Sequence, residues 1–254
     1  MKETNIFVKR ILKNKWKILT IDKIKEIYYD LETNPSDSKL YKQIYYLKNR
    51  DYLLSLKKDL FYVKKNDEEI FVDDIIEQNY WKFLKKYTKE QFWNNYFIWW
   101  IKSLEIWNNN FSIPDKITII NPFKRSNEVL FKWKNLVLVD YTIKWFDKEK
   151  SFKYFKKQTT KLKIDSKSFN IVNYEFSLLD SLYSMPFDEE KYILELVKKN
   201  IRKNWKRINL EVFEYFLKYG KYGSSIKRFY ELSLWIRPDF AAKIKEILKK
   251  WYWF

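Results

Sequence analysis

Glycine, the residue that tight turns and helix ends most often require, occurs only twice in this chain of 254 residues, whereas tryptophan occurs 12 times. A chain of this length ordinarily contains about 18 glycines. Positions that need a positive φ angle must therefore be filled by other residue types. Trp107 precedes a run of asparagines where a helix should end, and Trp133 lies where a turn should join two strand-like runs. Other tryptophans that neighbour Lys or Asn in turn-like settings are Trp16, Trp93, Trp145 and Trp205.

Codon usage offers one explanation of this imbalance. AT-rich coding DNA accounts for abundant Lys, Asn, Ile, Tyr and Phe and for scarce Gly, but not for abundant Trp, whose ordinary codon is not AT-rich. One hypothesis is that many tryptophans are UGA codons that the source organism reads as glycine. The alternative is a protein rich in genuine tryptophan. UGG codons at Trp99, Trp100, Trp107 and Trp133 would rule out the first reading.

Two residue types that support much of enzyme chemistry are missing, because the chain contains no cysteine and no histidine. Disulfides, thiol nucleophiles, Cys- or His-based zinc sites and Ser-His-Asp triads are therefore excluded. No Gly-rich phosphate loop is present, and no cofactor or metal is expected. The sequence has no run of about 20 apolar residues, and its first residues lack the apolar run of a signal peptide. These features predict a cytoplasmic protein with no membrane partner.

The net charge of +18 points to a polyanionic partner, nucleic acid before anionic membrane. AT-rich codon usage, which favours lysine, is the alternative explanation. The segment Met1–Lys65 contains 16 basic and 8 acidic residues and so carries +8 of the total. The remaining +10 lies beyond it, and DNA binding by the first segment leaves that part unexplained.

Apolar periodicity predicts three helices in the first fifty residues. The first covers 5–15, the second runs from Ile21 to Leu31 with Thr20 as its N-cap, and the third covers 36–49. Thr33-Asn34-Pro35-Ser36 breaks the chain before the third helix. Two short strands, 52–56 and 60–63, follow as a basic hairpin. This order is typical of a winged helix-turn-helix.

The third predicted helix buries Leu40, Ile44 and Leu47, which turns a polar and basic face outward. Lys suits phosphate or guanine, Gln suits adenine, and Tyr suits phosphate. The expected DNA contacts on this helix are Ser38, Lys39, Lys42, Gln43, Tyr45, Tyr46 and Asn49. Those on and behind the hairpin are Lys57, Lys58, Lys64 and Lys65. The alternative is a face that is merely solvated.

The polar stretch Asn66–Glu69 predicts a domain boundary. We expect a winged helix-turn-helix over 1–66 and an α+β domain over 67–254, mostly helical over 67–110, stranded over 111–173 and helical again over 174–254. The predicted fold class is therefore α+β, with a small sheet and a helical C-terminal tail.

Two enzyme-like or RNA-binding patterns compete with this interpretation. Asp140 and Lys144, together with Asp115 and Glu128, are similar to the acid-and-lysine grouping of Mg²⁺-dependent nucleases, although the spacing is loose. The basic, aromatic-rich stretch 144–163 is compatible with stacking of single-stranded RNA or DNA, and equally with aromatics buried beneath solvated lysines.

Several phrases of the sequence resemble the AbiEi-type antitoxins and transcriptional regulators of type IV toxin–antitoxin, or abortive infection, systems. The strand-like Ile113–Pro122 follows a short helical segment, and Tyr174–Asp180 resembles the family's E-x-x-L-L-D helix start. Tyr96–Ile106 resembles its small-residue stretch before a helix, more closely if Trp99, Trp100 and Trp107 are glycines. The chain departs from the family at Asp51, where a glycine is usual ahead of the wing.

This resemblance implies a non-enzymatic repressor that acts in phage defence. Its N-terminal domain would bind double-stranded operator DNA upstream of its own operon, which places it at the nucleoid. Its C-terminal domain would counter a nucleotidyltransferase-like toxin. The toxin, as a partner, is implied by the resemblance alone.

Overall fold

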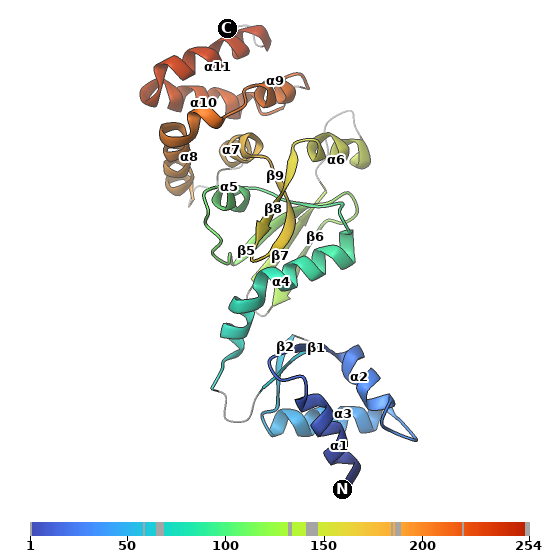
Figure 1. The fold of residues 1–254 in the computed structure, drawn as a ribbon. Helices are drawn as coiled ribbons and strands as arrows, with labels where there is room; N and C mark the ends of the chain where they lie inside the picture. The colour runs from blue at the N-terminus through green and yellow to red at the C-terminus, as the bar shows by residue number, and fades with distance from the viewer. Residues whose placement is uncertain are drawn as a thin grey trace. The chain divides into compact units, whose positions relative to one another are not determined.

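The computed structural model describes residues 2–57, 59–64, 69–131, 134–140, 147–183, 185, 189–219 and 221–251. The fold is α+β, and the chain forms two compact units (Figure 1). The N-terminal unit comprises Met1–Tyr80 and Val129–Lys134, and the C-terminal unit comprises Trp81–Glu128 and Asn135–Phe254. The division falls inside a helix, later in the chain than the polar stretch at which the sequence predicts a boundary.

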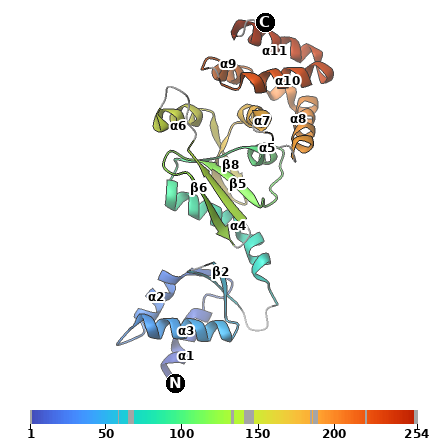
Figure 2. The same cartoon turned by 180° about the vertical axis from the view of Figure 1, so that it is seen from behind.

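The described residues of the N-terminal unit form three complete helices and a three-stranded antiparallel sheet. In chain order these are α1 (Lys2–Leu12), β1 (Ile18–Thr20), α2 (Ile21–Tyr29), α3 (Asp37–Asn49), β2 (Leu53–Lys57) and β3 (Leu60–Val63). The strand order is β1-β3-β2, so the hairpin strand β3 is central. Figure 2 shows the three helices of this unit from behind.

Local signals explain where α2 and α3 begin. The side chain of Thr20 accepts a hydrogen bond from the backbone N–H of Lys23, and that of Ser36 accepts one from Lys39, both at 3.3 Å. These caps confirm the predicted helix starts. Leu40, Ile44 and Leu47 are all buried in the core of this unit, as the periodicity predicts. Strand β1 was not predicted, because three residues are too few to show an alternating pattern.

Asp51, at the end of α3, stands where the family that the sequence resembles usually has glycine. Asp51 has a φ of 57°, the left-handed conformation for which glycine is usual. The N–H of Tyr52 donates to Leu47 O at 2.9 Å, which closes the helix in a Schellman-type turn. Aspartate tolerates this conformation better than most residues do. Its carboxylate also pairs with the ammonium of Lys64, one residue beyond β3.

The C-terminal unit is built on a six-stranded mixed sheet with the order β6-β7-β5-β4-β9-β8. The elements of this region are α4 (Val72–Phe92), β4 (Phe97–Ile98), α5 (Ile101–Trp107), β5 (Lys116–Ile120), β6 (Ser126–Phe131), β7 (Lys134–Val139), α6 (Lys148–Lys156), β8 (Thr159–Ile164) and β9 (Lys167–Val172). On one face Trp81 of α4 packs edge-on against Phe169, and on the other Phe97 stacks on Phe152 of α6, with ring centroids 5.6 Å apart in both pairs.

Helices complete the chain, as the sequence predicts. They are α7 (Tyr174–Tyr183), α8 (Glu190–Asn204), the short 3-10 helix η1 (Trp205–Arg207), α9 (Glu211–Leu217), α10 (Gly223–Ile236) and α11 (Pro238–Trp251). Helix α7 is buried along nearly its whole length. The described residues include no helix with the length and apolar character of a membrane span.

The left-handed position at Asp51 makes a stability prediction. Asp51→Gly and Asp51→Val both remove the carboxylate that pairs with the buried Lys64, so the difference between their stabilities reports the backbone conformation. Asp51→Val should be about 1–3 kcal/mol less stable than Asp51→Gly, since a β-branched residue is strained at positive φ. Chemical denaturation of the full chain measures both. Equal stability of the two variants would contradict the conformational argument.

Candidate nucleic-acid interface

The outward face of α3, formed by Ser38, Lys42, Tyr45 and Asn49, is exposed as predicted. Tyr45 has 66% of its surface accessible, more than Tyr41 or Tyr46 on the same helix. Lys39 and Tyr46 are also exposed, and Gln43 is half-buried. Because Leu40, Ile44 and Leu47 are buried, the opposite face of the helix is turned toward solvent.

A polar contact fixes the start of α3. The hydroxyl of Tyr29, at the end of α2, donates to the Asp37 carboxylate at 2.6 Å, and the Lys25 ammonium lies 3.5 Å from the same group. These contacts, the Tyr29 hydrogen bond foremost, lower the pKa of Asp37. They join α2 to α3, so the angle between the two helices is set by side chains as well as by the short connection.

The sequence reasoning missed two residues on this surface. Arg50, the C-cap of α3, is exposed and lies over the Tyr46 ring with its guanidinium carbon 5.7 Å from the centroid. An arginine held by an aromatic ring is ordered before it meets a phosphate. Tyr41 is also about half exposed. Their spacing along the helix could have identified both.

Of the lysines expected to contact DNA on and behind the hairpin, the structure describes the side chain of Lys64. Lys58 and Lys65, and the side chain of Lys57, lie outside the described residues. Lys64 differs from the expectation of an exposed phosphate contact, because only 8% of its surface is accessible and its ammonium pairs with Asp51. It therefore joins the end of the hairpin to the end of α3.

The grouping that resembles a nuclease site is not assembled. Asp140 pairs with Lys148, and the Glu128 carboxylate accepts hydrogen bonds from Tyr87 and Ser126 and pairs with Lys124. Among the described residues, no three acidic side chains come together in a way that could hold a metal ion. Lys144 lies outside the described residues.

The aromatic side chains of the basic stretch 144–163 are buried. Phe152, Tyr154 and Phe155 belong to the main core of the C-terminal unit, whereas Lys161 and Lys163 on β8 are exposed. The rings are therefore not free to stack on bases. Of the two interpretations of this stretch, the arrangement favours buried aromatics beneath solvated lysines; Phe146 lies outside the described residues.

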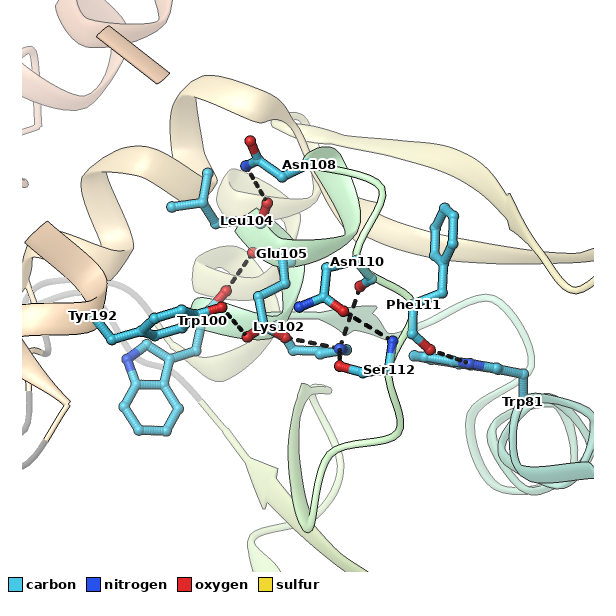
Figure 3. Close-up of polar contacts among 11 residues, drawn as sticks. Trp81, Trp100, Lys102, Leu104, Glu105, Asn108, Asn110, Phe111, Ser112 and Tyr192 are labelled. Carbon is cyan, nitrogen blue, oxygen red and sulfur yellow. Dashed lines mark hydrogen bonds and ion pairs between the residues drawn. The ribbon is translucent and has the colours of Figure 1, made fainter. Parts of the chain in front are cut away.

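A polar network lies beside a cleft of about 450 Å³ between α5, the loop after it, and α8 (Figure 3). The buried Lys102 ammonium donates to Glu105 at 2.8 Å and to Asn110 O and Ser112 Oγ at 3.3 Å. The Tyr192 hydroxyl donates to the other Glu105 oxygen at 2.8 Å. Burial and this hydrogen bond raise the pKa of Tyr192 to about 12. Lys102 and Glu105 thus form an ion pair, and the Tyr192 hydrogen bond links α8 to α5.

The two acids of the motif that resembles E-x-x-L-L-D are buried structural groups. Glu175 accepts a hydrogen bond from the backbone N–H of Asn209 at 2.8 Å. Asp180 accepts one from the Tyr222 hydroxyl at 2.8 Å, and burial raises its pKa well above 3.8. Each acid therefore links α7 by a hydrogen bond to a residue that lies just before a later helix.

No protein-family model and no curated protein sequence matches the chain. Its fold is similar to that in the crystal structure of the Rv2827c protein from Mycobacterium tuberculosis, with a TM-score of 0.57 and 12% identity. The similarity covers 99% of this chain and 82% of that one. At this identity the match shows a shared fold.

The buried Asp180 predicts a pH dependence of stability. Its folded-state pKa is raised, so the folded protein retains a proton that the unfolded chain releases above about pH 3.8. Stability should therefore fall as the pH rises from 3.8 to the raised pKa, by up to about 1.4 kcal/mol per pH unit. Asp180→Asn should remove this slope, and Asp239→Asn, at an exposed position, should keep it. Parallel pH profiles for wild type and Asp180→Asn would contradict the assignment.

The Lys102–Glu105 pair makes a second prediction. Glu105→Ala should destabilise the protein by about 3 kcal/mol, because it leaves the buried Lys102 ammonium without its counter-charge. Glu195 also lines the cleft and pairs with the more exposed Lys198, and Glu195→Ala should cost less than about 1 kcal/mol. Denaturant midpoints compare the two. Equal losses would show that the first pair contributes no more than a surface ion pair does.

Proposed function

We propose that the N-terminal unit is a winged helix-turn-helix that binds double-stranded DNA with α3 in the major groove and the β2–β3 hairpin beside it. The observation that carries the proposal is the exposed outward face of α3, on a helix whose opposite side is fully packed. The element order α1-β1-α2-α3-β2-β3 and the strand order β1-β3-β2 are those expected of this motif.

The basic residues of α3 also support the proposed DNA binding. Lys39, Lys42 and Lys48, with Arg50 at the end of the helix, surround the polar outward face, and Asp37 is the acidic residue of this helix. The lysines and arginine suit phosphate contacts that position the protein, while Asn49 and Gln43 have side chains that can read base edges.

We further propose that the protein represses its own operon and acts as the antitoxin of a type IV toxin–antitoxin system, countering a nucleotidyltransferase-like toxin. This part rests on the resemblance carried by Tyr96–Ile106, Ile113–Pro122 and Tyr174–Asp180. The C-terminal unit would then provide the antitoxin activity, and the protein would reside at the nucleoid. A nucleotidyltransferase-fold reading frame directly downstream is the expected genomic context.

A gel-shift titration on DNA from upstream of the reading frame tests DNA binding. Lys42→Ala should weaken binding across sequences and reduce the slope of log K against log salt by about 1, as expected for one lost phosphate contact. Asn49→Ala should instead lower the preference for the upstream DNA over random DNA by about 1–3 kcal/mol.

Lys163→Ala, an equal change of charge on the C-terminal unit, is the matched control and should leave binding near the wild-type value. If Lys42→Ala and Lys163→Ala behave alike, binding reflects overall charge and the α3 interface is wrong. Co-expression with the downstream gene tests the antitoxin role, which fails if growth is arrested equally with and without this protein.

A further inference from the structure

Three tryptophans have backbone conformations that suit glycine. Trp16 has a φ of 61°, Trp93 of 55° and Trp100 of 63°. The ψ of Trp100 is −156°, which places it in a region occupied almost only by glycine. For a bulky residue each of these conformations is a genuine outlier.

The other large aromatic residues of the chain provide an internal comparison. Positive φ occurs at three of the nine described tryptophans, but at one, Tyr222, of the 35 described phenylalanines and tyrosines. Aromatic bulk therefore does not explain the pattern. The remaining non-glycine positions with positive φ are Asp51, Asp59, Asn109, Asp165 and Ser166, small polar residues of the kind that turns use.

Each of the three positions lies in a turn or at the end of a helix, where glycine is common. Trp16 lies in the turn between α1 and β1, and its N–H donates to Val63 O at 2.9 Å. Trp93 follows the last residue of α4, where a helix ends in the left-handed conformation. Trp100 occupies the N-cap position of α5, directly after β4.

Burial does not offset the backbone cost at the first two positions. Trp16 is 63% exposed and Trp93 is 72% exposed. An exposed indole buries little apolar surface, so it offsets little of the cost of a strained backbone.

Trp81 shows the opposite arrangement. It is 6% exposed, its indole N–H donates to Phe111 O at 3.1 Å, and its ring packs edge-on against Phe169. Glycine here would leave a cavity and an unpaired carbonyl. Trp107 also differs from expectation: the left-handed position after α5 is Asn109, with φ 60°, and the Trp107 indole donates to Val172 O at 2.9 Å. Trp133 lies outside the described residues.

We propose that positions 16, 93 and 100 are glycine in the protein as its own organism makes it, encoded by UGA codons read as glycine, whereas position 81 is a genuine tryptophan. The hypothesis that many tryptophans are UGA-encoded glycine thereby gains three assigned positions and one internal control. It also means that the exposed indoles at 16 and 93 are not a docking surface for a partner.

The coding DNA and the native protein test the assignment directly. We expect UGA at codons 16, 93 and 100 and UGG at codon 81. Peptide mass spectrometry of protein purified from its source should give glycine masses at the three positions and a tryptophan mass at position 81. UGG codons at all three positions, or tryptophan masses there, would overturn the proposal.

Stability of recombinant protein from synthetic genes provides a second test that needs no source organism. Trp16→Gly and Trp93→Gly should each raise the Tm by about 2–4 °C, because the left-handed backbone is then unstrained and an exposed indole contributes little packing. Trp81→Gly should lower it. Losses at positions 16 and 93 as large as the loss at position 81 would contradict the proposal.

Discussion

The C-terminal unit depends on the burial of α7. A helix that is apolar on one side packs against one partner, but α7 is buried from Tyr174 to Leu182 and must be enclosed by other elements. Its two carboxylates lie inside this enclosure, and each accepts a hydrogen bond from a residue on a later segment. Buried acids without such donors would be costly, so the positions of α9 and α10 are tied to the motif on α7.

In the N-terminal unit the corresponding element is α3, and both of its ends are fixed by side chains. Tyr29 and Lys25 hold Asp37 at the start, and Lys64 holds Asp51 at the end. Because Lys64 follows the last hairpin strand, the ion pair sets the hairpin relative to the helix. Under the proposed DNA-binding role, a rigid relation between these two elements would let α3 contact a groove while the hairpin contacts the flanking backbone.

Much of this arrangement could be predicted from the sequence. The inward positions of α3, the caps at Thr20 and Ser36, and the bounds of β3 and α7 follow from periodicity and hydrogen-bonding residue types acting over a few neighbours. Local patterns could not identify β1, because its partner in the register Ile18↔Tyr62 to Thr20↔Leu60 lies 40 to 44 residues further along the chain. Helix α6 lies within 111–173, the region that the sequence predicts as stranded.

The candidate site shows the same division between local and distant effects. Exposure of Lys42, Tyr45 and Asn49 follows from helical geometry alone. Burial of Lys64 does not, since it depends on an acidic residue 13 positions earlier in the chain. For a related reason, the spacing of the acids does not reveal that Asp140 and Glu128 each pair with a lysine.

Strand β8 lies at the end of the six-stranded sheet and so presents an open edge. An open edge can pair with a strand from another copy of the chain and begin aggregation. Lys161 and Lys163 lie exposed along β8, and Lys167 opposite Ile164 continues the positive charge into β9. A second copy that approached edge to edge would bring like charges together, which disfavours the pairing of β8 with itself.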